Sequence, residues 1–281
     1  MRILLILFIL LSTNPSISQD SLNTHQYPVP STEAGMVGYV NGNDEFVIEP
    51  QYSSGTYFEN ESYAVVTKHI NDVEKFAVID TAGNYIISFD KDYELISLGN
   101  QLDGWITVIK DGKWGYINKN NDLLIPLRYK NLGDFYGGLA YAKKGNRYGY
   151  IDTSNNVIID FKYKWALDFG SIKPDGFRYA PVEKVRKRGY INNKGDLAVK
   201  CKYDFGYQFR NGLVPVEKKG KWGVINTKGE TIVPFEYDLI QPIGDEEVII
   251  ARKDETWNID YCFNWQGELL EQRTREEKEL Y

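Results

Sequence analysis

Lysine and arginine side chains gather at four points along the chain, where they could bind an anionic partner. Each group surrounds a short turn between two apolar runs: Lys110 and Lys113; Lys143, Lys144 and Arg147; Lys184, Arg186, Lys187 and Arg188; and Lys218, Lys219 and Lys221. Because these turns recur regularly, we expect them along one rim, where a positive stripe attracts an anionic polymer or an acidic protein face. The alternative interpretation is that lysine protects exposed turns and strand edges from pairing with other chains.

Residue types that support catalysis or metal binding form no recognisable pattern. The two histidines, His25 and His69, have polar neighbours and are interpreted as solvated surface residues. Residues 90–94 alternate carboxylates as a calcium loop does, but the sixth-position Gly and the closing Glu are missing, with Gln101 at the twelfth position. We therefore predict a non-enzymatic protein without catalytic, cofactor or metal residues. A glycoside-processing enzyme, which needs two close carboxylates, is the least favoured alternative.

Aromatic side chains suggest a second kind of binding. They make up 14% of the chain, and most occupy fixed positions of a repeat, as core residues do. Trp105, Trp165 and Trp265 fall outside those positions. Since aromatic rings can stack on sugar faces, glycan binding is the alternative function, although tryptophans are more often packing residues.

Composition and the first residues indicate an exported protein. The 281 residues are 42% hydrophobic with a net charge of −6, which excludes a general nucleic-acid binder. Arg2 precedes an apolar run at residues 3–11, and small residues Ser16 and Ser18 precede Gln19. This layout predicts a signal peptide at 1–18, because the run is too short to span a bilayer, and an extended linker at 19–35. We expect the protein in the periplasm, at the cell surface or outside the cell, with no later transmembrane segment.

A short apolar strand followed by Asn or Asp recurs seven times and sets the architecture. The strand contains a fixed glycine with a period of about 34 to 40 residues, at Gly38, Gly115, Gly149, Gly189 and Gly223, with Ala77 and Tyr261 in the other two copies. Asn or Asp stands three residues later, and Gly, Asn or Asp three after that. Asx side chains bond turn backbones, and Gly or Asn accepts positive φ, so each copy is predicted to contain a tight hairpin.

A returning apolar strand and a further strand complete each copy. Tyr52, Tyr129, Tyr163, Tyr203 and Tyr237 follow the returning strand at a fixed offset. The fold predicted for residues 36–271 is therefore all-β, a tandem array of about seven antiparallel meanders. Both faces of the central strand are apolar or glycine, which favours propeller-like stacking; an open β-hairpin solenoid is the alternative. The strand glycine is expected to admit a neighbouring group, such as an aromatic ring of the next unit.

The motif resembles the WG-containing repeat family. The unit of that family is similar to residues 221–226, followed by Ile232-Val233-Pro234 and Tyr237-Asp238, and residues 113–118 match it as well. The resemblance covers residues 36–271 and implies a bacterial β-repeat protein that binds a partner. It carries no catalytic residue to this chain.

The remaining features are minor. Cys201 and Cys262 lie in copies that are not adjacent, so we expect two unbridged cysteines, with a disulfide as the less favoured alternative. Residues 272–281 form a charged tail, which is expected to be a last helix or to fray. Taken together, the sequence predicts an exported scaffold that binds a protein or an anionic envelope polymer through its surface.

Overall fold

Seven antiparallel sheets make up the protein. The computed structural model describes residues 29–58, 62–98, 104–243, 248–253 and 259–274. Sheet 1 has three strands and sheets 2 to 7 have four, and neighbouring strands in a sheet are consecutive in the chain. No helix in the described ranges is long and apolar enough to cross a membrane. The predicted all-β array of about seven meanders is confirmed.

The strands of the first four sheets are as follows. Sheet 1 contains β1 (Val29–Glu33), β2 (Met36–Val40) and β3 (Phe46–Tyr52). Sheet 2 contains β4 (Ser54–Gly55), β5 (Tyr63–Ile70), β6 (Val73–Asp80) and β7 (Tyr85–Ile87), and a 3-10 helix, η1 (Phe89–Lys91), follows it. Sheet 3 contains β8 (Leu95–Ser97), β9 (Ile106–Lys110), β10 (Lys113–Ile117) and β11 (Leu123–Tyr129). Sheet 4 contains β12 (Asn131–Leu132), β13 (Leu139–Lys144), β14 (Arg147–Asp152) and β15 (Val157–Tyr163).

The last three sheets repeat the pattern of sheet 4. Sheet 5 contains β16 (Trp165–Ala166), β17 (Tyr179–Lys184), β18 (Lys187–Asn192) and β19 (Leu197–Tyr203). Sheet 6 contains β20 (Phe205–Gly206), β21 (Leu213–Lys218), β22 (Lys221–Asn226) and β23 (Thr231–Tyr237). Sheet 7 contains β24 (Leu239–Ile240), β25 (Ile249–Arg252), β26 (Ile259–Phe263) and β27 (Leu269–Thr274).

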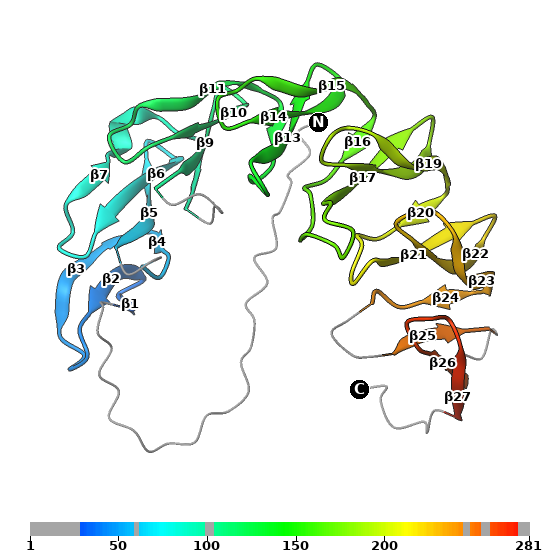
Figure 1. The fold of residues 1–281 in the computed structure, drawn as a ribbon. Coiled ribbons are helices and arrows are strands. Elements are labelled where there is room, and N and C mark those ends of the chain that lie inside the picture. The colour runs from blue at the N-terminus through cyan, green and yellow to red at the C-terminus, as the bar shows by residue number, and fades with distance from the viewer. Residues whose placement is uncertain (1–28, 59–61, 99–103, 244–247, 254–258, 275–281) are drawn as a thin grey trace.

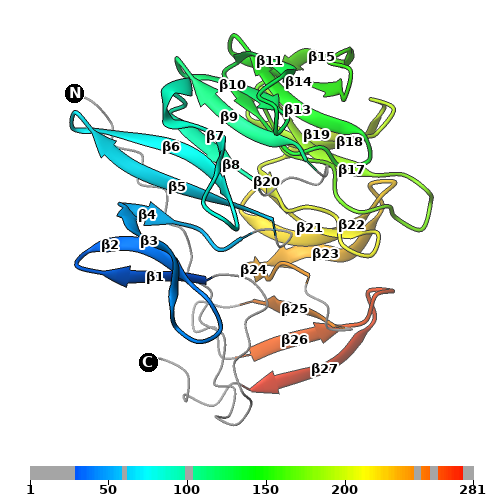
Figure 2. The same cartoon turned by 90° about the vertical axis from the view of Figure 1, so that its left-hand side faces the viewer.

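The sheets stack face to face along an open arc. Six hydrophobic clusters each join two consecutive sheets; one of them packs Tyr116 of sheet 3 against Ala140 and Ile151 of sheet 4. Within the described residues no cluster joins sheet 7 to sheet 1. Figure 1 shows fourth strands such as β7, β11 and β15 on the outside of the arc and sheets 1 and 7 at its separate ends; Figure 2 shows the same succession from the side. The stacking is therefore propeller-like, and the array does not close.

Each strand glycine is required by its own sheet. Trp114 faces Tyr129 and Tyr116 faces Ile125, so two steps along β10 correspond to four along β11. This bulge brings the main chain of β11 so close that a Cβ on Gly115 would lie 2.6 Å from the Ile125 carbonyl oxygen. Gly189 meets the Val199 oxygen in the same way, at 2.5 Å. The expectation of an aromatic ring from the next unit was wrong, because the approaching group is the bulged neighbouring strand.

The two copies without this glycine lack a bulge at the glycine position, although each keeps the register shift next to its Asx turn. In sheet 2, β7 is short and ends at Ile87, so no bulged backbone crosses Ala77. In sheet 7, Asp260 pairs with Arg273 and Tyr261 with Gln272, residue for residue. A side chain is therefore tolerated at both positions.

The predicted Asx hairpin is confirmed in all seven copies. The Asn226 Oδ1 accepts the backbone N–H groups of Lys228 and Glu230 at 3.0 Å, and the Asp152 Oδ1 accepts those of Ser154 and Asn156 at 2.9 and 2.8 Å. The residue three beyond each Asx has positive φ, at Asp44, Gly83, Asn121, Asn155, Gly195, Gly229 and Gly267.

A complementary side-chain pair locks each of these turns. An Asn at the turn start donates Nδ2–H to an acid four residues later, as Asn226 does to Glu230 at 2.6 Å. Where the turn starts with Asp, the fourth residue is Asn, as in Asp152 with Asn156 at 2.9 Å. The Asn156 hydrogen bond lowers the pKa of Asp152. Every pair thus contains one amide and at most one charge.

Breaking this complementarity gives a first prediction. Asn226→Asp places two carboxylates side by side, so we expect the free energy of unfolding at pH 7 to fall by about 1 kcal/mol. Asp152→Asn is the matched control, and its loss is expected to be clearly smaller because two amides can still bond each other. Urea titration of both variants measures the difference. Equal losses in the two variants would contradict the pairing rule.

In five of the six connections between consecutive sheets, a single residue joins the last strand of one sheet to the first strand of the next. The connecting residues are Ser53, Lys130, Lys164, Asp204 and Asp238. Each donates its backbone N–H to the second strand of the sheet being entered; Lys130, for example, donates to the Lys143 oxygen at 2.8 Å. The two strands are therefore almost one continuous strand that passes from one sheet to the next.

Two predicted boundaries differ from the structure. Residues 29–33, expected as part of the linker at 19–35, form β1, whose five residues pair with β2. Residues 272–274, expected in the charged tail, belong to β27 and pair with Ile259, Asp260 and Tyr261. In both places the edge strand of a terminal sheet extends further than the motif does. The signal peptide at 1–18, the linker residues 19–28 and the tail residues 275–281 lie outside the described residues.

Candidate functional site

The basic turns lie at one end of the strands, as expected from the repeat. They join the second and third strands of sheets 3 to 6, whereas the Asx turns join the third and fourth strands. Because successive strands of a meander run in opposite directions, the two sets of turns lie at opposite strand ends. The connecting residues after the fourth strands return to the end that carries the basic turns.

One ion pair forms at this end of sheet 5 and one at this end of sheet 6. Lys187 pairs with Asp204, and Lys221 pairs with Asp238. In sheet 2, Lys75 pairs with Asp92 at the same spacing of 17 residues. Of the ten residues predicted to bind a partner in sheets 4 to 6, Lys187 and Lys221 therefore have acidic partners of their own.

The two connecting residues that flank sheet 4 break this pattern, because both are lysines: Lys130 follows Lys113 of sheet 3 by 17 residues, and Lys164 follows Arg147 of sheet 4 by 17. Lys130 and Lys164 occupy the connecting positions that are Asp204 and Asp238 in later sheets. The backbone N–H of Lys130 donates to the Lys143 carbonyl oxygen, and that of Lys164 donates to the Glu183 carbonyl oxygen. Within the described part of the chain, no carboxylate forms an ion pair with the five basic side chains here. We call this group the basic rim: Lys130, Lys143, Lys144, Arg147 and Lys164.

The other predicted residues are placed less favourably. The Arg188 guanidinium lies 4.3 Å from the ring centre of Trp165 and 4.0 Å from that of Phe205, and it donates to the Gly206 oxygen. This side chain packs between sheets instead of facing a partner. The Lys184 ammonium lies over Tyr163 and that of Lys218 over Phe235, at 5.2 and 5.9 Å, and Lys143 of the basic rim lies over Tyr148 in the same way, at 5.1 Å. The sequence interpretation missed Lys130 and Lys164. Both directly follow the recurring Tyr, so a comparison of that position between the copies could have found them.

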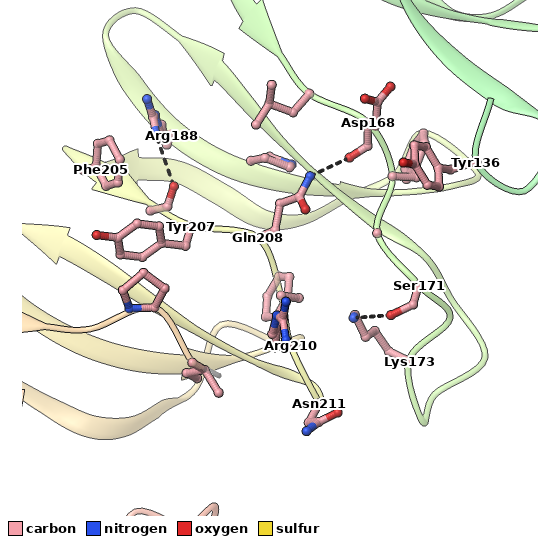
Figure 3. Close-up of a pocket in the computed structure, with 18 of the residues that line it drawn as sticks. Tyr136, Asp168, Ser171, Lys173, Arg188, Phe205, Tyr207, Gln208, Arg210 and Asn211 are labelled. Atoms are coloured by element: carbon pink, nitrogen blue, oxygen red, sulfur yellow. Dashed lines mark hydrogen bonds between the residues drawn. The ribbon is translucent and has the colours of Figure 1, made fainter. Parts of the chain in front are cut away.

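A cavity of about 780 Å³ lies on sheets 5 and 6, with further walls from sheets 4 and 7. Its lining comes from residues 165–173 (excluding Ala166 and Ile172), residues 205–211, and Tyr136, Pro181, Arg188, Pro242 and Ile243. Figure 3 shows Ser171, Lys173, Arg210 and Asn211 on one side of this inner pocket and Arg188, Phe205 and Tyr207 on another. The pocket therefore combines basic, amide and aromatic side chains.

Two half-buried carboxyl groups lie at this pocket: Asp168 lines it and Asp134 is close to Asp168. Burial, and then the charge of Asp134, raises the pKa of Asp168 to about 7, and burial also raises the pKa of Asp134. The Asp168 Oδ1 is buried against Gly133 and the Tyr141 ring, and it has no hydrogen-bond partner in the described structure. This oxygen is sealed off, and the Asp168 carboxyl points away from Lys173 in Figure 3; Asp134 is not among the residues that line the pocket.

The tryptophans and histidines proposed as surface residues differ in their surroundings. Trp105 packs edge-on against Tyr116 and Phe135, with ring centres 5.6 and 5.5 Å apart, and Trp265 packs against the core between sheets 6 and 7. Trp165 lines the inner pocket. His69 is exposed, as expected, whereas His25 lies outside the described residues. Cys201 and Cys262 are unbridged, in agreement with the prediction.

Solved structures with similar form have little sequence in common with this chain. A eukaryotic initiation factor is 10% identical, with a TM-score of 0.49, over 91% of this chain and 76% of that one. The dihydro-heme d1 dehydrogenase NirN is 12% identical, with a TM-score of 0.41, over 95% and 67%. Hsv2 of Kluyveromyces lactis is 10% identical, with a TM-score of 0.40, over 72% and 71%. No curated protein matches the chain in sequence at a significant level.

Family membership is clear from the repeats themselves. The model of the WG containing repeat matches residues 38–69, 114–148, 148–184, 189–222 and 222–257, which is more than half of the chain. These segments carry the glycine strand, the Asx hairpin and the bulged returning strand described above. The chain belongs to the WG containing repeat family.

Proposed function

We propose that the protein is a non-enzymatic repeat scaffold that binds an acidic partner through the basic rim. The observation that carries this proposal is the replacement of the ion-pairing aspartates by Lys130 and Lys164, the connecting residues that flank sheet 4. If lysine served only to protect exposed turns, an ion pair with Asp would not interfere, as in sheets 5 and 6, and the aspartates would not need to be replaced. Five cations without an acidic partner form a local positive surface on a protein whose net charge is −6.

The partner that fits this rim is an acidic protein face or an anionic polymer of the cell envelope. Lys144, Arg147, Lys130 and Lys164 are exposed, so they can reach a partner without rearrangement of the sheet. Exposed charges speed association and set salt dependence more than they set affinity. Binding is therefore expected to weaken steeply as salt is added.

Charge reversal tests this function. We expect Lys144→Glu combined with Arg147→Glu to weaken binding to poly-glutamate at low salt at least tenfold, which is about 1.4 kcal/mol. The control combines Lys119→Glu with Lys228→Glu, on exposed residues of Asx turns at the opposite strand ends. It changes the net charge by as much as the first variant does, and it is expected to bind as the native protein does. Interferometry on the full chain measures both variants. Equal weakening would show that only net charge matters, and absence of binding to poly-glutamate and to anionic envelope polymers alike would overturn the proposal.

We also propose that the scaffold acts after export from a bacterial cytoplasm. The apolar run at residues 3–11 and the small residues Ser16 and Ser18 support this location. N-terminal sequencing of the protein recovered from an expressing bacterium tests it. A mature chain that starts at Gln19 in the periplasmic or secreted fraction is expected, and an intact chain in the cytoplasm would contradict export.

A further inference from the structure

A loop between β16 and β17 reverses the usual placement of its side chains. Ile172 is 62% exposed, whereas the adjacent Lys173 is only 5% exposed. Backbone hydrogen bonds of 2.8 Å from Lys173 N to the Phe177 oxygen and from Gly176 N to the Lys173 oxygen fix this arrangement. Lysine is among the residues least often buried without a partner, and isoleucine is among those most often buried. Packing alone therefore does not explain why the lysine is the inward residue.

The Lys173 side chain has no ion-pair partner among the described residues, and the charge of Asp175 offsets only part of the lowering of its pKa by burial and by two arginines. The Lys173 Nζ donates to the Ser171 hydroxyl at 3.0 Å. The nearby Asp175 is already used, because it accepts hydrogen bonds from the Tyr179 hydroxyl and the Phe177 N–H. A buried cation without an ion-pair partner is costly unless an anion joins it.

The surroundings of Lys173 are themselves basic. Burial lowers the pKa of Lys173, and the charges of Arg210 and Arg178 lower it further. In Figure 3 the Lys173 ammonium is directed toward the pocket segment that carries Arg210 and Asn211. An oxyanion beside Lys173 would meet its ammonium and the neighbouring Ser171 hydroxyl, which are donors that such groups prefer.

The rest of the pocket suits a sugar ring. Trp165 and Tyr207 supply aromatic surface, and Gln208 and Asn211 supply amide groups that can bond hydroxyls. A volume of about 780 Å³ lies within the usual range of ligand pockets, about 300–1,000 Å³. We propose that the inner pocket binds an acidic sugar, whose carboxylate or phosphate group is held by Lys173. This site is separate from the basic rim, so either proposal can fail without the other.

Titration calorimetry of the full chain with glucuronate, glucose 6-phosphate and glucose tests this site. We expect at least one of the two charged sugars to bind, with the preferred one identifying the anionic group, and glucose to bind at least tenfold more weakly. Lys173→Met is expected to weaken binding of the charged sugar at least tenfold. Lys200→Met, on an exposed lysine of β19, is the matched control and is expected to leave binding unchanged.

Folding of the variant is checked separately. Because Lys173→Met removes a buried charge, its thermal midpoint is expected to equal or exceed that of the native protein, so lost binding would not reflect unfolding. Three results would overturn the proposal: no binding of either charged sugar, equal binding by native protein and Lys173→Met, or equal binding of glucose and the charged sugars. A lower midpoint for Lys173→Met together with unchanged binding would assign Lys173 a purely structural role.

Discussion

Replacement of Asp168 by Asn is expected to raise the free energy of unfolding above pH 7 and to remove much of the decrease of that free energy between pH 4 and pH 7. The pKa of Asp168 is about 7 in the folded protein, because the carboxyl is buried and close to Asp134. In an unfolded chain the pKa of Asp is about 3.9. Between these values the folded state holds a proton that the unfolded state has lost. The free energy of unfolding therefore falls as pH rises from about 4 to about 7.

The size of this effect follows from the difference between the two pKa values. Three units correspond to about 4 kcal/mol, which is an upper bound for the gain of Asp168→Asn at pH 8. At pH 4 the gain is expected to vanish, since the native carboxyl is then protonated in the folded state. Urea unfolding monitored by tryptophan fluorescence at several pH values measures the slope. Asp160→Asn, on the exposed part of β15, is the control, and an unchanged slope in Asp168→Asn would show that the carboxyl titrates normally.

Gly189→Ala is expected to cost about 3 kcal/mol or more of unfolding free energy. Its new Cβ would lie 2.5 Å from the Val199 oxygen and 2.7 Å from the Cys201 nitrogen, both of which are main-chain atoms. A backbone cannot rotate away as a side chain can, so the bulge between β18 and β19 must shift and strain the sheet. Urea titration of the variant measures the loss.

The chain provides its own control for this substitution. Ala77 occupies the same position in sheet 2, where β7 ends at Ile87, opposite Val78, so no bulged backbone crosses Ala77. Ala77→Gly is expected to lose about 1–2 kcal/mol, from backbone entropy and from the loss of one buried methyl group. If Gly189→Ala and Ala77→Gly changed stability equally, the close approach of the bulged strand would not be the reason for the glycine.

Much of the fold was predictable because it rests on local rules. The Asx side chain and the residue with positive φ define a turn within a few residues, and Asn226 and Gly229 behave as expected. The role of the glycine was mistaken, since a bulge is a relation between two strands and leaves little trace in either one. The single-residue connection through Lys164 was also not foreseen, because the sequence pattern marks strand centres better than their ends.

The candidate sites were less accessible from the sequence. Neutralisation of Lys187 by Asp204 depends on contacts between residues 17 positions apart in different sheets. The segment containing Lys173 departs from the repeat and is recognisable as an insertion, but its direction into the pocket depends on the packing of sheets 5 and 6. Burial of Asp168 against Gly133 is likewise a contact between sheets. Local patterns therefore predicted the scaffold, whereas contacts between units determine its chemistry.

The single-residue connection between sheets has a consequence for cooperativity. Because β15 continues through Lys164 into β16, sheet 4 cannot lose its outer strand without disturbing the inner edge of sheet 5. In repeat proteins, the coupling between neighbours decides whether units unfold singly or together. Here covalent continuity adds to the hydrophobic clusters between sheets, so neighbouring sheets are expected to melt as one block. A shortened protein would therefore keep complete sheets only if a whole number of repeats were deleted. The two ends of the deletion would have to lie at equivalent positions of two such shared strands.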